Sequence, residues 1–236
     1  MGHPTAPTGI TRRTLLEWLG TGITLSLGPG LLRALEAAAA QPGGGDPQLR
    51  PGQGEAPLFA SWPVRTVDSQ DLAAILAGWR LQVGGLVERP FSLSFADLLA
   101  SRTDRTADLH CVEGWSVLDI RWSGVPLAEL LARARPLAIA THVNFHTLGA
   151  KYNESLPLAV AREPATLLAF AAAGETLPLA HGFPLRLVVP RLLGYKSAKF
   201  VHRVELADRP LQGFWVQNGY PYGGEVPSER LRAGRY

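Results

Sequence analysis

The chain has 236 residues, of which 46% are hydrophobic and 18% are charged, and its formal net charge is +3. That length supports one domain with its own core. The small net charge, without a long basic run, excludes a protein that holds nucleic acid through its phosphates. The single cysteine, Cys111, excludes an internal disulfide, an iron–sulfur ligand set and a covalent haem motif.

The first forty residues show, in order, the features of a bacterial export signal. The pair Arg12-Arg13 precedes an apolar stretch over residues 15–35, and alanines at 37–40 offer a cleavage site. We therefore predict a twin-arginine signal over residues 1–40 and an exported, periplasmic protein. The alternative is a basic amphipathic helix that belongs to the domain itself.

Residues 41–57 are rich in Gly, Pro and Gln, which predicts a flexible linker ahead of one domain over residues 58–236. Apolar and polar residues alternate over 79–83, which predicts a strand that the Gly84-Gly85 pair breaks with a turn or a bulge. The alternation resumes over 91–95 and predicts a second strand.

Three helices are predicted along the chain. Ser94 is placed to cap a short helix that ends near Leu99, with Asp97 at the capping-box position. A second helix covers 126–134 and places its leucines on one face. A third covers 164–173, opened by a proline and closed by a glycine.

Further strands are predicted over 108–112, 143–147, 185–189 and 200–206, and the first of them delivers Cys111 at or near its end. The last two flank a loop over 194–199 that holds two of the three lysines in the chain. Short strands mixed with short helices predict an α+β domain with mixed sheets, not a doubly wound sheet.

Cys111 alone is open to four interpretations: a small buried hydrophobe, a bridge to another molecule, a nucleophile or a soft-metal ligand. Its context is Cys-Val-Glu-Gly-Trp-Ser at 111–116, followed by Trp-Ser-Gly-Val-Pro-Leu at 122–127. This pattern resembles the metal-ligand segment of the sulfite-oxidase-type molybdopterin oxidoreductases, and the resemblance extends roughly over 79–206. It implies the sulfite-oxidase-type fold, a molybdenum–molybdopterin cofactor and a Cys111 thiolate bound to molybdenum.

The same resemblance implies further site residues. Arg186 is informative even without it, because an arginine in an apolar strand is costly unless it is paired. The segment 197–199 matches positions that hold the cofactor phosphate through backbone amides and a cation. Tyr152 matches a tyrosine that faces the metal, although Lys151 replaces the family's glycine. The implied catalytic residues are Cys111 and Tyr152. The implied cofactor contacts are Cys111, Thr147, His181, Arg186, Ser197, Ala198 and Lys199, and the neighbouring Lys196 is an additional candidate.

Departures from the family pattern bear on the substrate. Sulfite oxidases place an arginine four residues after the ligand cysteine, and this chain has Trp115 there. The version with tryptophan resembles the bacterial branch that reduces methionine sulfoxide, but that branch has asparagine in place of His181. We expect two-electron oxygen-atom transfer that reduces a sulfoxide or a related S- or N-oxide. Sulfite-dehydrogenase-like oxidation of an oxyanion is the alternative, with Arg65 or Lys151 as the candidate anion contact.

Because one cysteine leaves no second redox centre, electrons are expected from a separate haem protein or a quinol-linked membrane protein. Two other functions stay open. One is a redox-inactive relative that only binds molybdopterin, which turnover would distinguish from the enzyme. The other is a cysteine hydrolase, which metal analysis would distinguish from a molybdenum protein. Such a hydrolase would pair Cys111 with one of five histidines: His110, His142, His146, His181 or His202.

Overall fold

The computed structural model describes residues 48–49, 58–67 and 70–236. The predicted signal over 1–40 lies outside the described residues, as does most of the predicted linker. Within that linker, β1 (Gln48–Leu49) is described, and it pairs in parallel with the start of β5.

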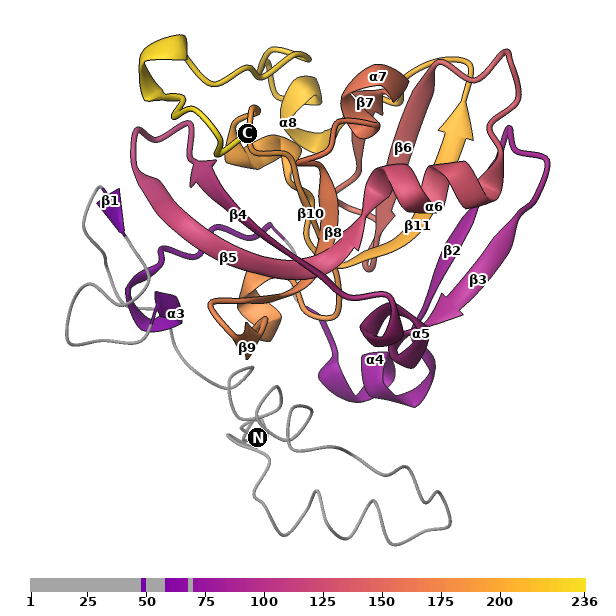
Figure 1. Ribbon diagram of the computed structural model, residues 1–236, viewed down its shortest axis with the longest axis horizontal. Coiled ribbons are helices and arrows are strands. Elements are labelled where there is room, and N and C mark those ends of the chain that lie inside the picture. The colour runs from indigo at the N-terminus through magenta and orange to yellow at the C-terminus, as the bar shows by residue number, and fades with distance from the viewer. Residues whose placement is uncertain (1–47, 50–57, 68–69) are drawn as a thin grey trace, which may run out of the picture.

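The described strands form two mixed sheets, which Figure 1 shows side by side. Besides β1, the first sheet contains β4 (Thr103–His110), β5 (Ser116–Pro126), β8 (Leu167–Ala172), β9 (Glu175–Thr176) and β10 (Arg186–Val188). Its strand order is β1-β5-β8-β10. In addition, β4 pairs with β5, and β9 pairs with β8. The second sheet has the order β3-β2-β11-β6-β7, and its strands are β2 (Arg80–Gly85), β3 (Phe91–Ser94), β6 (His142–Thr147), β7 (Glu154–Pro157) and β11 (Val201–Ala207). The predicted α+β class with mixed sheets is confirmed.

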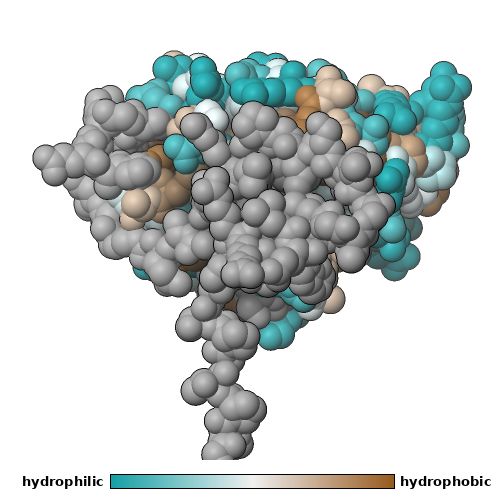
Figure 2. Space-filling view, turned by 90° about the horizontal axis from the view of Figure 1, so that it is seen from below, coloured by the Kyte–Doolittle hydropathy of each residue, from teal (hydrophilic) through white to brown (hydrophobic). Residues whose placement is uncertain are grey.

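Short helices connect the strands and cover their edges (Figure 1). They are α3 (Leu58–Ser61), α4 (Leu72–Gly78), α5 (Phe95–Ala100), α6 (Leu127–Ala134), α7 (Leu158–Ala161) and α8 (Phe214–Gln217). Among the described residues, no helix has the length and apolar character that a membrane crossing needs. From below, hydrophilic side chains predominate along the outer rim of the described surface, and the hydrophobic ones form small patches (Figure 2).

Side chains from both sheets meet in one large buried cluster. Leu187 comes from β10 of the first sheet, whereas Phe145 and Val204 come from the second. The α6 helix adds its leucine face, on which Leu127 and Leu131 are completely buried. Burying one such leucine stabilises the fold by about 1.5–3 kcal/mol. The core therefore fixes the two sheets, and the loops between them, relative to each other.

Several local predictions are confirmed. Ser94 Oγ accepts the amide of Asp97 at 3.2 Å, and the Asp97 carboxylate accepts the Ser94 amide at 2.8 Å, which completes the capping box of α5. The α6 helix and the predicted strands around 79–83, 91–95 and 143–147 also form, with ends shifted by a few residues. Local signals were sufficient where one face of an element is polar.

The helix predicted over 164–173 is wrong, because Leu167–Ala172 is strand β8. All six of its residues are buried, and alternate side chains enter two different hydrophobic clusters, with Leu168 in one and Ala169 in the other. A strand covered on both faces shows no polar alternation, so its sequence resembles a helix. The glycine expected to end the helix instead forms the β8–β9 turn with Ala173, both at positive φ. Pairing and burial outweigh the intrinsic helix preference, which is less than about 1 kcal/mol per residue.

The predicted break at Gly84-Gly85 is also wrong, because β2 continues through Gly85 beside β11. Gly85 has φ +83°, and a Cβ there would lie 2.2 Å from the carbonyl oxygen of Leu206. The glycine therefore permits close approach of two strands instead of ending one.

Candidate active site

Cys111 lies in the tight turn between β4 and β5. Its amide donates to the Trp115 carbonyl at 2.9 Å, and Gly114, at φ +98°, donates its amide back to the Cys111 carbonyl at 3.2 Å. The cysteine is half-buried, and burial raises the pKa of its thiol. The prediction that a strand delivers Cys111 near its end is confirmed, since β4 ends at His110.

The cysteine turn borders a cavity of about 350 Å³ between the two sheets. The other walls come from residues 62–67, from the start of β10 and from the loop that connects β10 to β11 across the two sheets. Six of the nine predicted site residues line it: Cys111, Tyr152, His181, Arg186, Ser197 and Lys199.

Arg186 supplies a buried positive charge in this cavity and is only 5% exposed. Its guanidinium carbon lies 5.3 Å from the ring centre of Trp62 and 5.4 Å from that of Trp122, and these two indoles contact each other edge to face, so the cation packs beside the indole pair. One terminal nitrogen donates to the His181 carbonyl at 3.1 Å, but the buried Nε has no acceptor in the part of the chain that the structure describes. Burial lowers the pKa of Arg186 to about 10, so the group stays charged at neutral pH.

Lys199 brings a second cation close to the first. Its Nζ donates to the carbonyls of Arg65 at 2.6 Å and Ala180 at 2.9 Å. Burial, and then the charge of Arg186, lower the pKa of Lys199 to about 7. Gly182 allows this approach, because a Cβ there would lie 3.0 Å from both side chains. Within the described ranges neither cation pairs with a carboxylate, so the cavity has the charge to hold an anion.

His181 contributes a neutral ring. It is 4% exposed, and burial followed by the charge of Arg186 lowers its pKa to about 3. Its Nε2 lies 3.3 Å from the Trp62 carbonyl, and its Nδ1 has no partner among the described residues. The ring packs against Phe59 and Trp62. A donor or acceptor on a bound group would satisfy the free nitrogen.

The loop over residues 194–199 runs directly beside the cysteine turn. A Cβ on Gly194 would lie 3.5 Å from the His110 carbonyl oxygen and 4.0 Å from the Cα of Cys111. In the described part of the chain, the amides of Ala198 and Lys199 donate to no acceptor. Backbone amides followed by a cation are the arrangement that the sequence predicted for a phosphate.

Three predicted residues lie behind the cavity wall. Lys196 donates to Glu154, at 2.5 Å, and to the Ser155 carbonyl, so its charge is already compensated. Thr147 donates its hydroxyl to the Tyr152 carbonyl and so supports the turn that carries this tyrosine. Ala198 is completely buried. Their assignment as cofactor contacts stays a prediction, and for Lys196 the structure provides a different partner.

Tyr152 reaches the cavity, but its hydroxyl donates to the backbone carbonyl of Tyr195. Its ring stacks on Phe214 of α8, with ring centres 5.8 Å apart. Burial raises the pKa of Tyr152 well above the ordinary value, so the phenol stays protonated. Trp215 and Tyr220, from the same C-terminal segment, complete that side of the cavity.

The cavity mouth carries an ion pair that includes Arg65. The Glu113 carboxylate accepts Arg65 Nε at 2.8 Å and the indole Nε1 of Trp115 at 2.9 Å. Arg65 and Glu113 are both exposed, so this contact is weak in energy. It nevertheless neutralises the cation that an anionic substrate would meet first.

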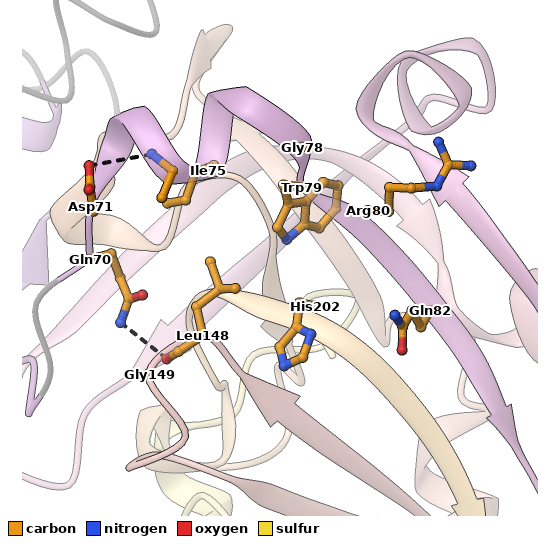
Figure 3. A pocket seen from close by; sticks show the side chains of 11 residues that line it. Gln70, Asp71, Ile75, Gly78, Trp79, Arg80, Gln82, Leu148, Gly149 and His202 are labelled. Atoms are coloured by element: carbon orange, nitrogen blue, oxygen red, sulfur yellow. Dashed lines mark hydrogen bonds between the residues drawn. The ribbon is translucent and has the colours of Figure 1, made fainter.

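A larger hollow of about 470 Å³ lies beneath α4 and is a different feature (Figure 3). Its polar groups are mostly engaged in the fold: Asp71 caps α4, Gln70 donates to the Leu148 carbonyl and Arg80 binds Ser92. It has neither the cysteine nor the uncompensated cations, so the chemistry belongs to the smaller cavity.

The residues of this cavity fit a cofactor that brings most of its own metal ligands. No group of three or more His, Cys, Asp and Glu residues that could hold a metal is present among the described residues. Cys111 is then the one soft donor here, and a sulfur-rich cofactor would supply the others. The cations Arg186 and Lys199 and the free amides beside them suit the phosphate of such a group.

Two features of the cavity were not predicted. Trp62 and Trp122, which hold the Arg186 guanidinium, lie 60 residues apart in the sequence and face it only after folding. An arginine in an apolar strand indicated that a partner must exist, but no spacing indicated that the partners would be indoles.

The comparison with protein families agrees with this geometry. A family model described as "Oxidoreductase molybdopterin binding domain" matches residues 66–215, which include all nine of the predicted catalytic and cofactor-binding residues. The chain belongs to this family. It is a molybdopterin-dependent oxidoreductase, and the resemblance inferred from the cysteine motif is confirmed.

Several curated relatives share this domain. The chain is 38% identical over 169 residues to the "Uncharacterized oxidoreductase YuiH" of Bacillus subtilis, which covers 71% of this chain and 85% of the relative. It is 39% identical to the "Protein-methionine-sulfoxide reductase catalytic subunit MsrP" of Xanthomonas axonopodis pv. citri, over 59% of this chain and 48% of the relative. It therefore spans about half the length of the MsrP proteins it matches.

Among solved structures, the sulfane dehydrogenase SoxCD of Paracoccus pantotrophus is similar, with a TM-score of 0.51 and 30% sequence identity. The match covers 57% of this chain and 39% of that chain. It supports the sulfite-oxidase-type molybdopterin fold. The two kinds of relative carry the names of a reductase and a dehydrogenase, so family membership alone does not fix the direction of electron flow.

Proposed function

We propose that this protein is an exported molybdenum-cofactor oxidoreductase that reduces sulfoxides or related S- or N-oxides by two-electron oxygen-atom transfer. The observation that carries the proposal is the meeting of Cys111 with two uncompensated cations, Arg186 and Lys199, in one cavity. In the reaction, a sulfoxide, two electrons and two protons become a sulfide and water. The bound cofactor supplies the redox chemistry, as is general for cofactor enzymes.

The residues of the chain bind and orient. Cys111 provides the thiolate that fixes the metal end of the cofactor, while Arg186 and Lys199 bind its phosphate end. Tyr152 keeps a proton on its hydroxyl, because burial raises its pKa, and can exchange the Tyr195 carbonyl for an oxygen of the substrate. His181 stays neutral and adds no further charge.

The cavity mouth favours a neutral substrate. Glu113 already binds Arg65, and Trp115 occupies the position at which sulfite oxidases place an arginine. A doubly charged oxyanion would find no free fork donor there, whereas the alkyl groups of a sulfoxide would contact indole. We therefore place sulfoxide reduction ahead of sulfite oxidation. The MsrP relatives support this order, and the SoxCD likeness supports the alternative.

The cysteine hydrolase has little geometric support. His110 lies with its Nδ1 2.8 Å from Ser116 Oγ, across the hairpin and not on the thiol. His181 shares the cavity, but its low pKa makes it a poor base at neutral pH. In the described part of the chain, no histidine is hydrogen-bonded to Cys111.

Three measurements on one purified preparation test the proposal. We expect about one molybdenum per chain by elemental analysis, reduction of sulfoxides with an artificial electron donor, and slower oxidation of sulfite. Protein with bound molybdopterin but no turnover in either direction would indicate a binding module. Fast sulfite oxidation without sulfoxide reduction would reverse the substrate order and point to Arg65 or Lys151 as the anion contact.

We also propose export through the twin-arginine route, with electrons supplied by a separate haem protein or quinol-linked membrane protein. The support is the Arg12-Arg13 pair ahead of an apolar stretch. Replacing both arginines by lysine should leave unprocessed precursor in the cytoplasm. Normal periplasmic accumulation of that double variant would contradict the signal.

A further inference from the structure

The cysteine turn is held from outside by a residue of the C-terminal segment. The partly buried Arg230 donates to the Cys111 carbonyl at 3.1 Å, to the Trp115 carbonyl at 3.0 Å and to Ser116 Oγ at 3.0 Å. Each of these carbonyls also accepts an amide from within the turn. One guanidinium fork therefore joins both ends of the turn that carries the thiol.

The same segment is fixed beside the turn by two more arginines. Arg232 makes a two-pronged contact with the buried carboxylate of Asp108, at 2.7 and 2.6 Å, and Arg235 binds Asp119 at 2.7 Å. Asp108 lies on β4 and Asp119 on β5, so these contacts hold the strands below the turn. Arg230 is the member of the group that reaches the turn itself.

We propose that Arg230 is a positioning residue for the Cys111 thiolate. The inference rests on the proposed function, in which that thiolate is a metal ligand. Glycine at positive φ gives this tight turn a position of high backbone freedom, and a displaced sulfur binds metal poorly. Groups that orient a ligand commonly change metal affinity by 10–100-fold when they are removed. Arg230 is not part of the cysteine motif, and it acts through backbone carbonyls.

The test compares Arg230→Gln and Arg230→Lys with Arg232→Gln, a matched control from the same segment that contacts Asp108 of β4 and Asp119 of β5 instead of the turn. Two properties are measured on full-length protein, with thermal unfolding recorded for each variant. The first is the alkylation rate of Cys111 in cofactor-free protein. The second is the molybdenum content of loaded protein, with the electron paramagnetic resonance spectrum of its Mo(V) state.

We expect Arg230→Gln to alkylate at least several-fold faster than wild type, to lose most of its molybdenum and to show a changed spectrum. Arg230→Lys keeps the charge but not the fork and should restore these properties only in part. Arg232→Gln should lower the unfolding temperature without changing the alkylation rate or the spectrum. If thermal unfolding shows that Arg230→Lys is not folded, the comparison of Arg230→Gln with its control Arg232→Gln tests the inference.

Two results would overturn the inference. One is wild-type alkylation, occupancy and spectrum in Arg230→Gln; the other is an equal effect of Arg232→Gln, which would indicate general loosening of the segment. If wild-type protein carries no molybdenum, the proposed function fails. The alkylation comparison still decides whether Arg230 holds the turn.

Discussion

Lys196 and Lys199 are three residues apart, and the fold treats them in opposite ways. Lys196 points behind the cavity wall, where it binds the completely buried Glu154 and lies 4.5 Å from the ring centre of Tyr222. Lys199 lines the cavity, and among the described residues it donates its hydrogen bonds to backbone carbonyls. One cation is compensated within the protein, and the other is left for a bound anion.

This difference separates stability from function within one loop. Forming a buried ion pair costs free energy because both charges lose their hydration. Removing one partner then leaves the other charge buried and unpaired, so the pair holds the structure in place. A buried cation without a carboxylate is a permanent cost that only a ligand relieves. Arg186 shares this second condition, with an orphaned Nε at the same cavity. Variants on the two sides of the loop should therefore fail in different assays.

The largest effect is expected on the cavity side, at Cys111. Cys111→Ser should abolish molybdenum-dependent turnover and most metal binding, because a hydroxyl is a harder and weaker donor than a thiolate. The fold should persist, since the residue is half-buried and pairs through its backbone. Elemental analysis and circular dichroism measure the two properties. Full activity of the serine variant would show that Cys111 is not a ligand of the metal.

On the structural side, Lys196→Met leaves the Glu154 carboxylate buried and unpaired. We expect a loss of about 3–5 kcal/mol in the free energy of unfolding, measured by denaturant titration of cofactor-free protein. The double variant with Glu154→Gln is the control and should recover much of that loss. If Lys196→Met instead kept its stability and lost molybdopterin, the two lysines would have the same role.

Lys199→Met should weaken cofactor binding without lowering the stability of the cofactor-free protein, which is the reverse of Lys196→Met. The binding free energy of the cofactor should weaken by about 1.5–3 kcal/mol, the range for a hydrogen bond to a charged group, and cofactor occupancy should fall with it. The variant's stability without cofactor should be unchanged or higher, because a desolvated charge has been removed. Quantifying bound molybdopterin beside a denaturant titration checks both. A destabilised variant with full occupancy would show that Lys199 serves stability and not cofactor binding.

The same lysine predicts a pH effect. The pKa of Lys199 is lowered to about 7 in the fold from an ordinary value of 10.5, so between these values the unfolded chain binds more protons. The stability of cofactor-free protein should therefore rise with pH from about 7 to about 10.5, by at most about 1.4 kcal/mol per pH unit. Lys199→Met should lack this component when both are titrated. Parallel pH profiles for the two proteins would mean that Lys199 is solvated.

The smallest effect is expected at the cavity mouth. Glu113→Gln should release Arg65, and exposed pairs of this kind contribute about 0.2–1 kcal/mol. We expect a few-fold rise in kcat/KM for an anionic substrate relative to a neutral sulfoxide, and the rise should shrink in high salt. Arg65→Gln in the same background is the control and should abolish the gain.

The sequence was informative wherever a feature is local. The capping box at Ser94, the leucine face of α6 and the cysteine motif each depend on a few neighbouring residues, and each forms as expected. Six site residues taken from the family resemblance meet at one cavity. The α+β class followed from the mixture of short strands and helices.

Features that depend on distant contacts were not predictable. The run Leu167–Ala172 resembles a helix because both of its faces are buried, which only the complete sheets reveal. Lys196 and Lys199 have similar sequence surroundings. Glu154, on the distant strand β7, pairs with Lys196, and this contact determines which of the two lysines is compensated. Arg230 contacts backbone atoms about 115 residues away, and backbone contacts leave no pattern in a sequence.

The position of the cavity between the sheets has a consequence for the order of events in biosynthesis. Cys111 is made near the middle of the chain, but its opposite wall depends on Lys199, in the loop that joins the first sheet to the second. A nascent chain cannot present the complete binding surface until that loop has been translated and both sheets have docked. We therefore expect cofactor insertion to follow folding, and a chain arrested before residue 199 should capture no molybdopterin.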